Sequence, residues 1–205
     1  MLLTQNSKLK KTSRHFGVKV MNFGIPAYKT ASGKVTCPFA DKCVKFCYAK
    51  KGAYIWSNVK PAFERRYEAT KSDTFVADML AEIDKSNRGT QQLYIRVHDS
   101  GDYYSPKYAL KWREIALKRP NVRFYSYTNS ISIVKGIEWP QNYDFIFSDS
   151  GKQIHLINPS VDRHTQIFKS VEALRAAGAS DAHEYDLYAT KWYSQDTNLI
   201  GLIYH

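Results

Sequence analysis

The sequence predicts an α/β fold, a partial (β/α) barrel with a largely parallel sheet in a single domain. Apolar, strand-like stretches alternate with amphipathic helical ones, which is typical of parallel strands joined by right-handed crossovers. The chain has 205 residues, and a full eight-fold barrel typically needs ~250. An open or partial barrel therefore fits the length best.

The N-terminal part is expected to consist of an arm followed by the domain proper. Residues 1–15 have the composition of a flexible basic arm, and residues 16–205 form the single α/β domain. A short apolar stretch at 16–21 predicts the first strand, which Gly24 and Pro26 end.

Two helices are expected after a long loop. The loop, residues 36–50, has neither helical nor strand periodicity. Pro61 at a first-turn position opens one helix. Ser72 or Asp73 caps a second helix, whose apolar residues share one face and which ends at 87–89.

The middle of the chain repeats the pattern of strand and helix. Residues 93–97 predict a strand, and Ser105 caps the helix that follows it. Residues 122–127 predict the next strand, followed by a short helix that Pro140 ends. A further strand is expected at 144–148.

The C-terminal quarter is expected to contain one long helix between strands. Residues 153–157 are a candidate for an extra strand. Asp162 is expected to cap a long helix that ends at Gly178. Strands at 185–189 and 199–204 complete the prediction.

Cys37, Cys43 and Cys47 are the only cysteines of the chain and lie within eleven residues. An odd count leaves one thiol over, and the first residues do not resemble a secretion signal, so we expect a reducing cytoplasm. There a tight cysteine cluster indicates metal binding rather than disulfides. No stretch approaches the ~18 apolar residues of a membrane span, so no membrane partner is expected.

The positive charge of the chain is concentrated around these cysteines. Residues 1–71 hold 15 Lys and Arg against 3 Asp and Glu, whereas the remainder holds 15 against 16. Lysines flank the cysteine loop, with aromatic residues between them, and such interleaving suits a nucleic acid or nucleotide partner. A solvated face, or a charge that serves the metal alone, remains an alternative.

Polar residues follow the predicted strands, where parallel α/β proteins place their sites. The candidates for a pocket are His98, Asp99, Thr128, Asn129, Ser148 and Asp149. Taken singly, each is explained better by ordinary turn chemistry than by a site. The run at 98–102 has a histidine and two carboxylates around a glycine, more than a turn requires, although His98 could also be a structural histidine.

Two metals are compatible with three thiolates. A structural zinc site needs a fourth ligand, which His15, His98 or His155 could supply. A 4Fe–4S cluster on three cysteines instead leaves one iron open, and nearby aromatic side chains would shield it from water. The C-x5-C-x3-C spacing is not that of zinc knuckles, so iron–sulfur is favoured.

The cysteine loop resembles that of the radical S-adenosylmethionine superfamily, whose usual spacing is C-x3-C-x2-C with an aromatic before the last cysteine. Phe46 holds that place here, and Ser100, Gly101 and Asp102 are similar in character to the superfamily's Gly-Gly-Glu motif. The resemblance implies a 4Fe–4S cluster that binds S-adenosyl-L-methionine, with Asp102 near the amino group of the cofactor. The cysteine spacing and the Asp in place of Glu depart from the superfamily pattern.

Three pieces of the chain also look like a family of small phage-encoded proteins. They are TCPFADKCVKFCYA, IRVHDSGDYYSPKY and FYSYTNS, and together they span about residues 37–130. This resemblance implies a phage or prophage gene whose product acts in the host cytoplasm.

The leading hypothesis is an enzyme of radical S-adenosylmethionine type that acts on a nucleotide or nucleic acid and takes its electron from a separate donor. One alternative is a non-enzymatic iron–sulfur protein that binds nucleic acid or senses redox state. A zinc-stabilised binding module is the other alternative.

Overall fold

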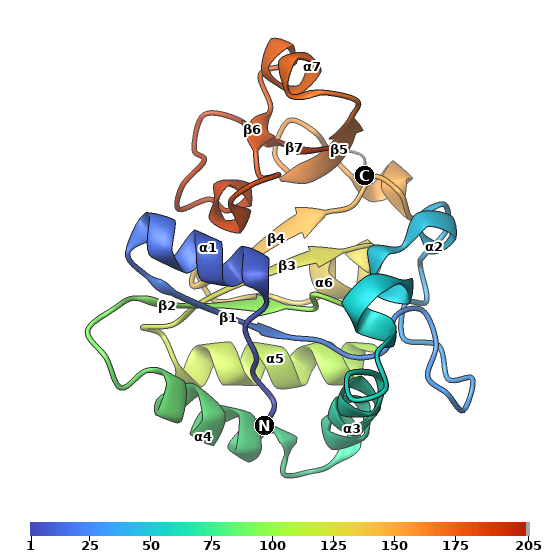
Figure 1. The fold of residues 1–205 in the computed structure, drawn as a ribbon, viewed down its shortest axis with the longest axis vertical. Coiled ribbons are helices and arrows are strands. Elements are labelled where there is room, and N and C mark those ends of the chain that lie inside the picture. Colours follow the sequence, from blue (N-terminus) through green and yellow to red (C-terminus); the bar gives the residue numbers. More distant parts are fainter. Residues whose placement is uncertain (204–205) are drawn as a thin grey trace.

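The computed structural model describes residues 1–203 and contains one parallel sheet curled into an open half-barrel (Figure 1). The strand order is β1-β2-β3-β4-β5-β7-β6, and every paired neighbour is parallel. The strands are β1 (Lys19–Phe23), β2 (Leu93–Val97), β3 (Arg123–Thr128), β4 (Tyr143–Phe147), β5 (His164–Phe168), β6 (Ser180–Asp181) and β7 (Leu199–Ile203). The predicted fold class is thus confirmed.

Helices connect these strands. The α-helices are α1 (Ser7–Phe16), α2 (Cys43–Phe46), α3 (Lys60–Lys71), α4 (Phe75–Ser86), α5 (Pro106–Lys118), α6 (Ile131–Lys135) and α7 (Val171–Ala176). Short 3-10 helices are η1 (Tyr48–Lys50), η2 (Gly52–Ile55), η3 (Ile154–Leu156) and η4 (Asp186–Ala189). None of the helices in residues 1–203 is both long enough and apolar enough to cross a membrane.

The sheet lies between two layers (Figure 1). Helices α4 and α5 cover one face, while α1 and the C-terminal segment around η4 cover part of the other. Alternate residues of β1 to β4 supply the two hydrophobic cores: in β2, Ile95 joins the core under α5 and Tyr94 joins the core under α1.

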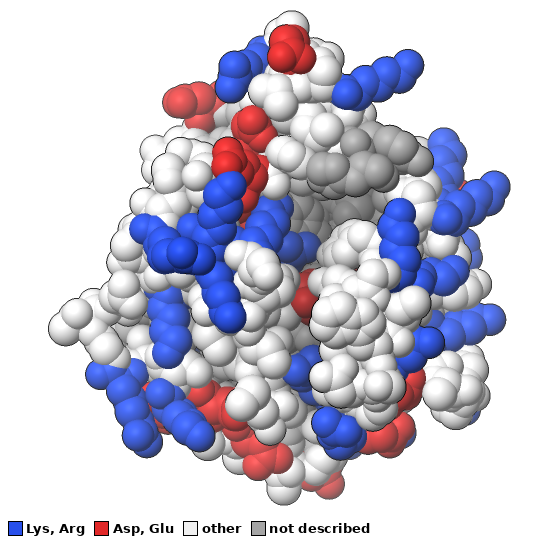
Figure 2. Space-filling model, viewed as in Figure 1, with Lys and Arg blue, Asp and Glu red and all other residues white. Residues whose placement is uncertain are grey.

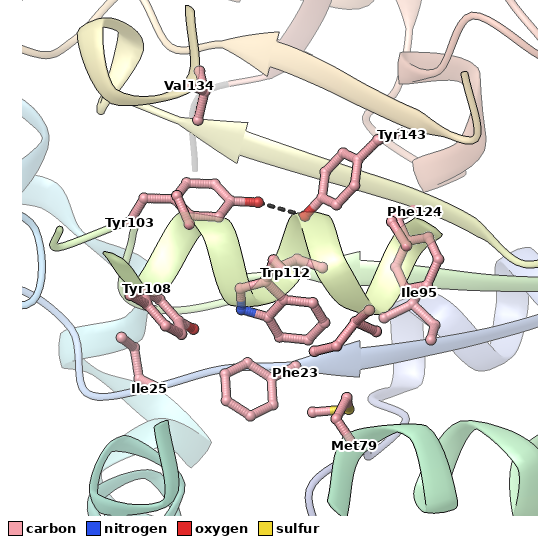
Figure 3. Packing of buried hydrophobic residues seen from close by; sticks show 14 of the residues in the cluster. Phe23, Ile25, Met79, Ile95, Tyr103, Tyr108, Trp112, Phe124, Val134 and Tyr143 are labelled. Carbon is pink, nitrogen blue, oxygen red and sulfur yellow. Dashed lines mark hydrogen bonds between the residues drawn. The ribbon is translucent and has the colours of Figure 1, made fainter. Parts of the chain in front are cut away.

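The core under α5 is built on aromatic rings (Figure 3). Trp112 is fully buried, and its ring centroid lies 5.2 Å from that of Phe23 on β1. Tyr103 and Tyr143 hydrogen-bond to each other inside this core. Burying such large rings supplies much of the hydrophobic free energy that keeps α5 on the sheet.

Helix α1 replaces the flexible arm that the sequence predicts for residues 1–15. Asn6 caps the helix by accepting a hydrogen bond from the Leu9 amide at 2.9 Å, and Gly17, with φ of 64°, ends it. Leu9 is fully buried against the sheet. The abundance of lysine hides this narrow apolar face in the sequence. The first strand accordingly begins later, at Lys19 rather than residue 16.

The predicted long helix at 162–178 is wrong. Residues His164–Phe168 form β5, and Ser170 then caps the short helix α7 by accepting from the Ala173 amide at 3.2 Å. Strand and helix lie end to end here, so their apolar residues together mimic a single helical period. Helix α7 ends at Ala176, and Gly178, whose φ is 66°, follows its C-cap Ala177.

Two further predicted strands are 3-10 helices instead. Residues 153–157 contain η3, and residues 185–189 contain η4. In both places a run of apolar residues too short to show a period was compatible with either structure. The last predicted strand is β7, although residue 204 lies outside the described residues.

The carboxylate of Asp186 joins elements from both ends of the chain to the middle of the sheet. It lies on η4 and is fully buried. Arg96 of β2 donates from Nη1 to both of its oxygens at 3.0 and 3.1 Å, Tyr125 of β3 donates at 2.6 Å, and Lys8 of α1 lies 3.0 Å away. The backbone amide of Asp186 also donates to Thr12 of α1 at 3.1 Å.

This surrounding charge sets the ionisation of Asp186. Burial by itself would raise the pKa of Asp186, but Arg96 and Lys8 outweigh that effect and lower the pKa to about 2. The side chain of Arg96 is only 12% exposed and that of Asp186 only 1%, so water could not take the place of a missing partner.

We expect Asp186→Asn to destabilise the protein by about 3–5 kcal/mol, because it leaves the buried guanidinium of Arg96 without its counter-charge. Urea unfolding at pH 7 measures the loss. The matched control is Asp84→Asn, which breaks the surface pair of Asp84 with Arg119 (2.6 Å) and should cost below about 1 kcal/mol. Equal losses in the two variants would contradict the central place of Asp186.

Candidate functional site

The cysteine segment, defined here as residues 37–56, lies across the edge where the strands end. Its start bridges the turn after β4: Ala40 pairs with Gly151, and the Lys152 amide donates to the Phe39 carbonyl at 2.8 Å. The Cys43 amide approaches the Ser150 carbonyl at 3.5 Å. Figure 2 shows the surface hollowed between α1 and this segment. The predicted convergence of the cysteines with the strand ends is therefore present.

Two tyrosines anchor the later part of the cysteine segment to the end of β2. The Tyr48 hydroxyl donates to the Asp99 carbonyl at 2.5 Å and accepts from Arg96 Nη2 at 3.3 Å. The Tyr54 hydroxyl donates to Asp99 Oδ2 at 3.2 Å. Since Arg96 also pairs with Asp186, these contacts link the cysteine segment to the buried ion pair.

The three thiols are half-buried, and none is in a disulfide. Cys37 Sγ accepts from the Tyr28 amide at 3.3 Å, and Asn129 Nδ2 points to Cys43 Sγ at 3.9 Å. Cys47 lines a hollow of about 170 Å³ beside α2. Its other lining residues are Val44, Lys45, Phe46, Lys50 and Lys51. Phe46, expected as a shield, thus lies beside a cysteine, although its ring is 39% exposed.

Burial favours the protonated form of two of these thiols, Cys37 and Cys47. It raises the pKa of Cys37, and the nearby carboxylate of Asp102 and the thiol of Cys47 raise it further. Burial also raises the pKa of Cys47, with a smaller contribution from Cys43.

The donor set fits an iron–sulfur cluster in its chemistry. Three free thiols lie on one segment, and the buried oxygen Oδ1 of Asn129 has no hydrogen-bond partner beside Cys43. Within residues 1–203, however, no three His, Cys, Asp or Glu side chains are grouped as a metal ion requires. A metal bound to these cysteines would replace the thiol protons.

Asp102 is buried, and its carboxylate already has three hydrogen bonds. Oδ1 accepts from the Tyr103 amide at 2.8 Å and from Thr128 Oγ1 at 2.6 Å, while Oδ2 accepts from the Asn129 amide at 2.9 Å. Burial raises the pKa of Asp102 to about 6, and these hydrogen bonds limit the rise. Asp102 thereby ties the turn after β3 to the turn after β2.

The glycine before Asp102 is needed for close packing. Gly101 has φ of 77°, and a Cβ there would lie 2.2 Å from Ile25. The Ser100 carbonyl accepts from the Ile25 amide at 3.0 Å. The predicted trio Ser100, Gly101 and Asp102 therefore forms a fixed turn against the chain leaving β1.

Asp99 contacts the cysteine segment through the hydroxyls of Tyr48 and Tyr54. Burial raises the pKa of Asp99, while Arg96 lowers it. Gly24 leaves room for this carboxylate, because a Cβ at Gly24 would lie 2.0 Å from Asp99 Oδ1.

His98 points away from the cysteines and into the core under α5. It has φ of 68°, and its Nε2 hydrogen-bonds the Tyr108 hydroxyl at 2.8 Å. Its ring packs on Tyr103 with centroids 4.6 Å apart. Burial lowers the pKa of His98 to about 3, so the ring is neutral at physiological pH. Of the two interpretations of His98, the structural one fits its position.

The remaining predicted residues lie along the same edge. The Thr128 carbonyl accepts from the Ser148 amide at 2.9 Å, which joins the turns after β3 and β4. The hydroxyl of Thr165 donates a hydrogen bond to Asp149 Oδ1 at 3.3 Å. Burial raises the pKa of Asp149, and the charges of His164 and Lys42 partly offset the rise. Lys42 belongs to the cysteine segment, so Asp149 faces it.

Residues outside the predicted pocket and ligand set connect the site to the fold, although the two tyrosines of the cysteine segment belong to the aromatic residues expected between the lysines. They are Arg96, Tyr48, Tyr54, Tyr125 and Asp186. The one available signal was Arg96, a charged residue in the middle of an otherwise apolar strand.

A second hollow, of about 610 Å³, lies at the opposite edge of the sheet, where the strands begin. Its lining includes Gln92, Arg123, Asn142 and Trp192. None of the predicted site residues borders it.

The stability of the protein should depend on pH through His98. An unfolded histidine takes up a proton near pH ~6.5, whereas the buried ring stays neutral until about pH 3. Lowering the pH from 7 to 5 therefore favours the unfolded state by about 2 kcal/mol through this residue. His98→Gln cannot take up this proton, so its unfolding free energy should gain about 2 kcal/mol relative to the original protein over that range.

Urea unfolding of both proteins at pH 7, 6 and 5 measures that difference. Comparing the two proteins cancels the opposite contribution of Asp102, whose raised pKa acts equally in both. A constant difference across the range would show that His98 is not buried as a neutral ring.

Comparison with known proteins places the chain among phage gene products. The family described as Gene product 88 matches residues 1–199. The Gene 88 protein of Mycobacterium phage L5 is 31% identical over 102 residues, which cover 45% of this chain and 42% of that protein. The Gene 88 protein of Mycobacterium phage D29 is 28% identical over the same shares. The chain thus covers less than half of the length of these relatives, and no solved structure matches it. By the match over residues 1–199, the chain belongs to the Gene product 88 family.

Proposed function

We propose that this protein is an iron–sulfur enzyme of radical S-adenosylmethionine type. Cys37, Cys43 and Cys47 would hold a 4Fe–4S cluster. The observation that carries the proposal is that every thiol of the chain lies on one segment anchored across the strand ends of a parallel half-barrel. Three thiolates leave one iron open for a small chelating ligand.

The residues around the cysteines divide into binding and positioning groups. Ser100 and Gly101 form the fixed turn that would face S-adenosyl-L-methionine, and Asp102 positions that turn through its three hydrogen bonds. Asn129, whose buried Oδ1 lacks a partner, would accept from a ligand amino group beside Cys43. Ser148 and Asp149 would line the remaining wall.

A reduced cluster of this kind supplies one electron to the bound sulfonium, and the radical chemistry that follows acts on a substrate hydrogen. The protein's own part is to exclude water and to orient the two ligands. The Tyr48 and Tyr54 anchors serve that part because they close the cysteine segment over the end of β2. The electron would come from a separate donor protein.

The basic surplus of residues 1–71 favours a nucleotide or nucleic acid as the substrate. Its site of action would be the cytoplasm of the phage host.

A second candidate is a non-enzymatic iron–sulfur protein that binds nucleic acid or senses redox state. The cysteine spacing favours it over cleavage of S-adenosyl-L-methionine, since C-x5-C-x3-C is longer than the superfamily pattern. Of the three candidate fourth ligands for zinc, His98 turns into the core and away from the cysteines.

Anaerobic purification tests the metal. We expect a brown protein with broad absorption near ~400 nm, which zinc cannot give because its d shell is full. Changing all three cysteines to alanine should abolish the colour and the bound iron. The matched control is His98→Gln, which should keep both, because His98 faces Tyr108 rather than the cysteines.

Addition of S-adenosyl-L-methionine to the reduced protein separates the two candidates. The enzyme predicts a changed EPR signal of the cluster, since the ligand would bind the open iron. An unchanged signal would remove the enzymatic proposal and leave the non-enzymatic one. Iron retained by the triple cysteine variant would refute the assignment of the ligands.

A further inference from the structure

The cysteine segment has an inner side and an outer side. On the inner side the hydroxyls of Tyr48 and Tyr54 reach Asp99 and Arg96. These hydrogen bonds fix the path of the backbone. Ile55 and Trp56, which follow the second tyrosine, are exposed.

Large apolar side chains face solvent on this outer side. Trp56 is 61% exposed, Ile55 is 48% exposed and Phe46 is 39% exposed. No ring contact in the described part of the chain involves Trp56 or Phe46, whereas Tyr48, which is also 52% exposed, packs on Tyr54 with centroids 5.6 Å apart. Rings left open on an anchored segment indicate a binding surface.

Positive charge is concentrated in the same stretch of the chain. Residues 42–63 contain five lysines and no acidic residue. Within residues 1–203, none of these lysines forms an ion pair. Lys45, Lys50 and Lys51 border the same 170 Å³ hollow as Phe46. Figure 2 shows basic side chains gathered on the flank where α2 lies.

We propose that the outer side of the cysteine segment binds single-stranded nucleic acid. Unpaired bases stack on Trp56 and Phe46, and the phosphates contact Lys45, Lys50 and Lys51. This inference rests on the nucleic-acid part of the proposed function and names the form of the partner and its docking surface.

A single strand fits this surface better than a duplex or a bilayer. Bases stacked within a duplex have no free faces to offer to exposed rings, whereas unpaired bases do. A membrane-surface helix needs a continuous apolar face. Helix α2 has only four residues, and lysines separate the rings, so a bilayer finds no such face.

Fluorescence anisotropy with a labelled twelve-nucleotide oligo(dT) tests the surface on the whole 205-residue chain. Trp56→Ala should weaken binding about 5- to 150-fold, the usual effect of losing one stacking ring. The control Leu117→Ala removes an equally open apolar side chain, 49% exposed, from α5 and should change nothing.

The lysines are tested by the salt dependence of the same binding. Changing Lys45, Lys50 and Lys51 together to Gln should lower the slope of log affinity against log salt by about 2, because three phosphate contacts are lost. The control changes Lys85, Arg88 and Lys107 to Gln, exposed residues elsewhere on the surface. It removes the same charge and should leave the slope nearly unaltered.

Three outcomes would overturn the surface. In the first, Trp56→Ala and Leu117→Ala bind the oligonucleotide with equal affinity. In the second, the protein binds the annealed duplex as tightly as the single strand. In the third, it binds phosphatidylserine vesicles but not the oligonucleotide. Iron content measured on the same samples keeps the proposals apart. A protein that holds iron but does not bind the oligonucleotide refutes the binding surface alone. An iron-free protein whose oligonucleotide binding depends on Trp56 supports the surface and refutes the cluster.

Discussion

The buried ion pair of Asp186 with Arg96 is the contact on which the arrangement of this protein depends. It joins η4 near the C-terminus to the central strand β2, and Lys8 adds α1 from the N-terminus. Removing charges from water is costly, so the pair is stable only because Tyr125 and Lys8 complete its hydrogen bonds. Chain ends that hydrophobic contact alone would hold loosely are thereby placed on one face of the half-barrel.

The guanidinium of Arg96 also links the buried ion pair to the candidate site. Arg96 donates from Nη2 to Tyr48, whose hydroxyl also reaches the Asp99 carbonyl. The cysteine segment therefore lies across the strand ends at a position set by a strand residue, not by its own short helices. Cys43 of this segment contacts the turns after β3 and β4, whereas Cys47 borders the hollow that Phe46 and three lysines also line. A single anchored segment can thus serve both a metal and a polyanion.

Sequence patterns predicted the sheet well where each element had its own start and stop signals. Strand β2 and helix α5, with its Ser105 cap, agree with the expectation, because one period covers each element. The prediction failed at β5 and α7, where two elements share one apolar run, and at α1, where lysines conceal a narrow face. The gathering of polar strand ends was predictable from parallel topology. Which of them point inward was not: His98 enters the core through a positive φ that its neighbours in sequence do not indicate.

The most direct test of the proposed cluster is the ⁵⁷Fe Mössbauer spectrum of the anaerobically reconstituted protein. Three cysteine ligands for four irons predict one iron site that differs from the other three and whose signal shifts when S-adenosyl-L-methionine is added. Four equivalent irons would contradict a cluster with an open position. A protein that takes up no iron while its three cysteines stay reduced would contradict the cluster altogether.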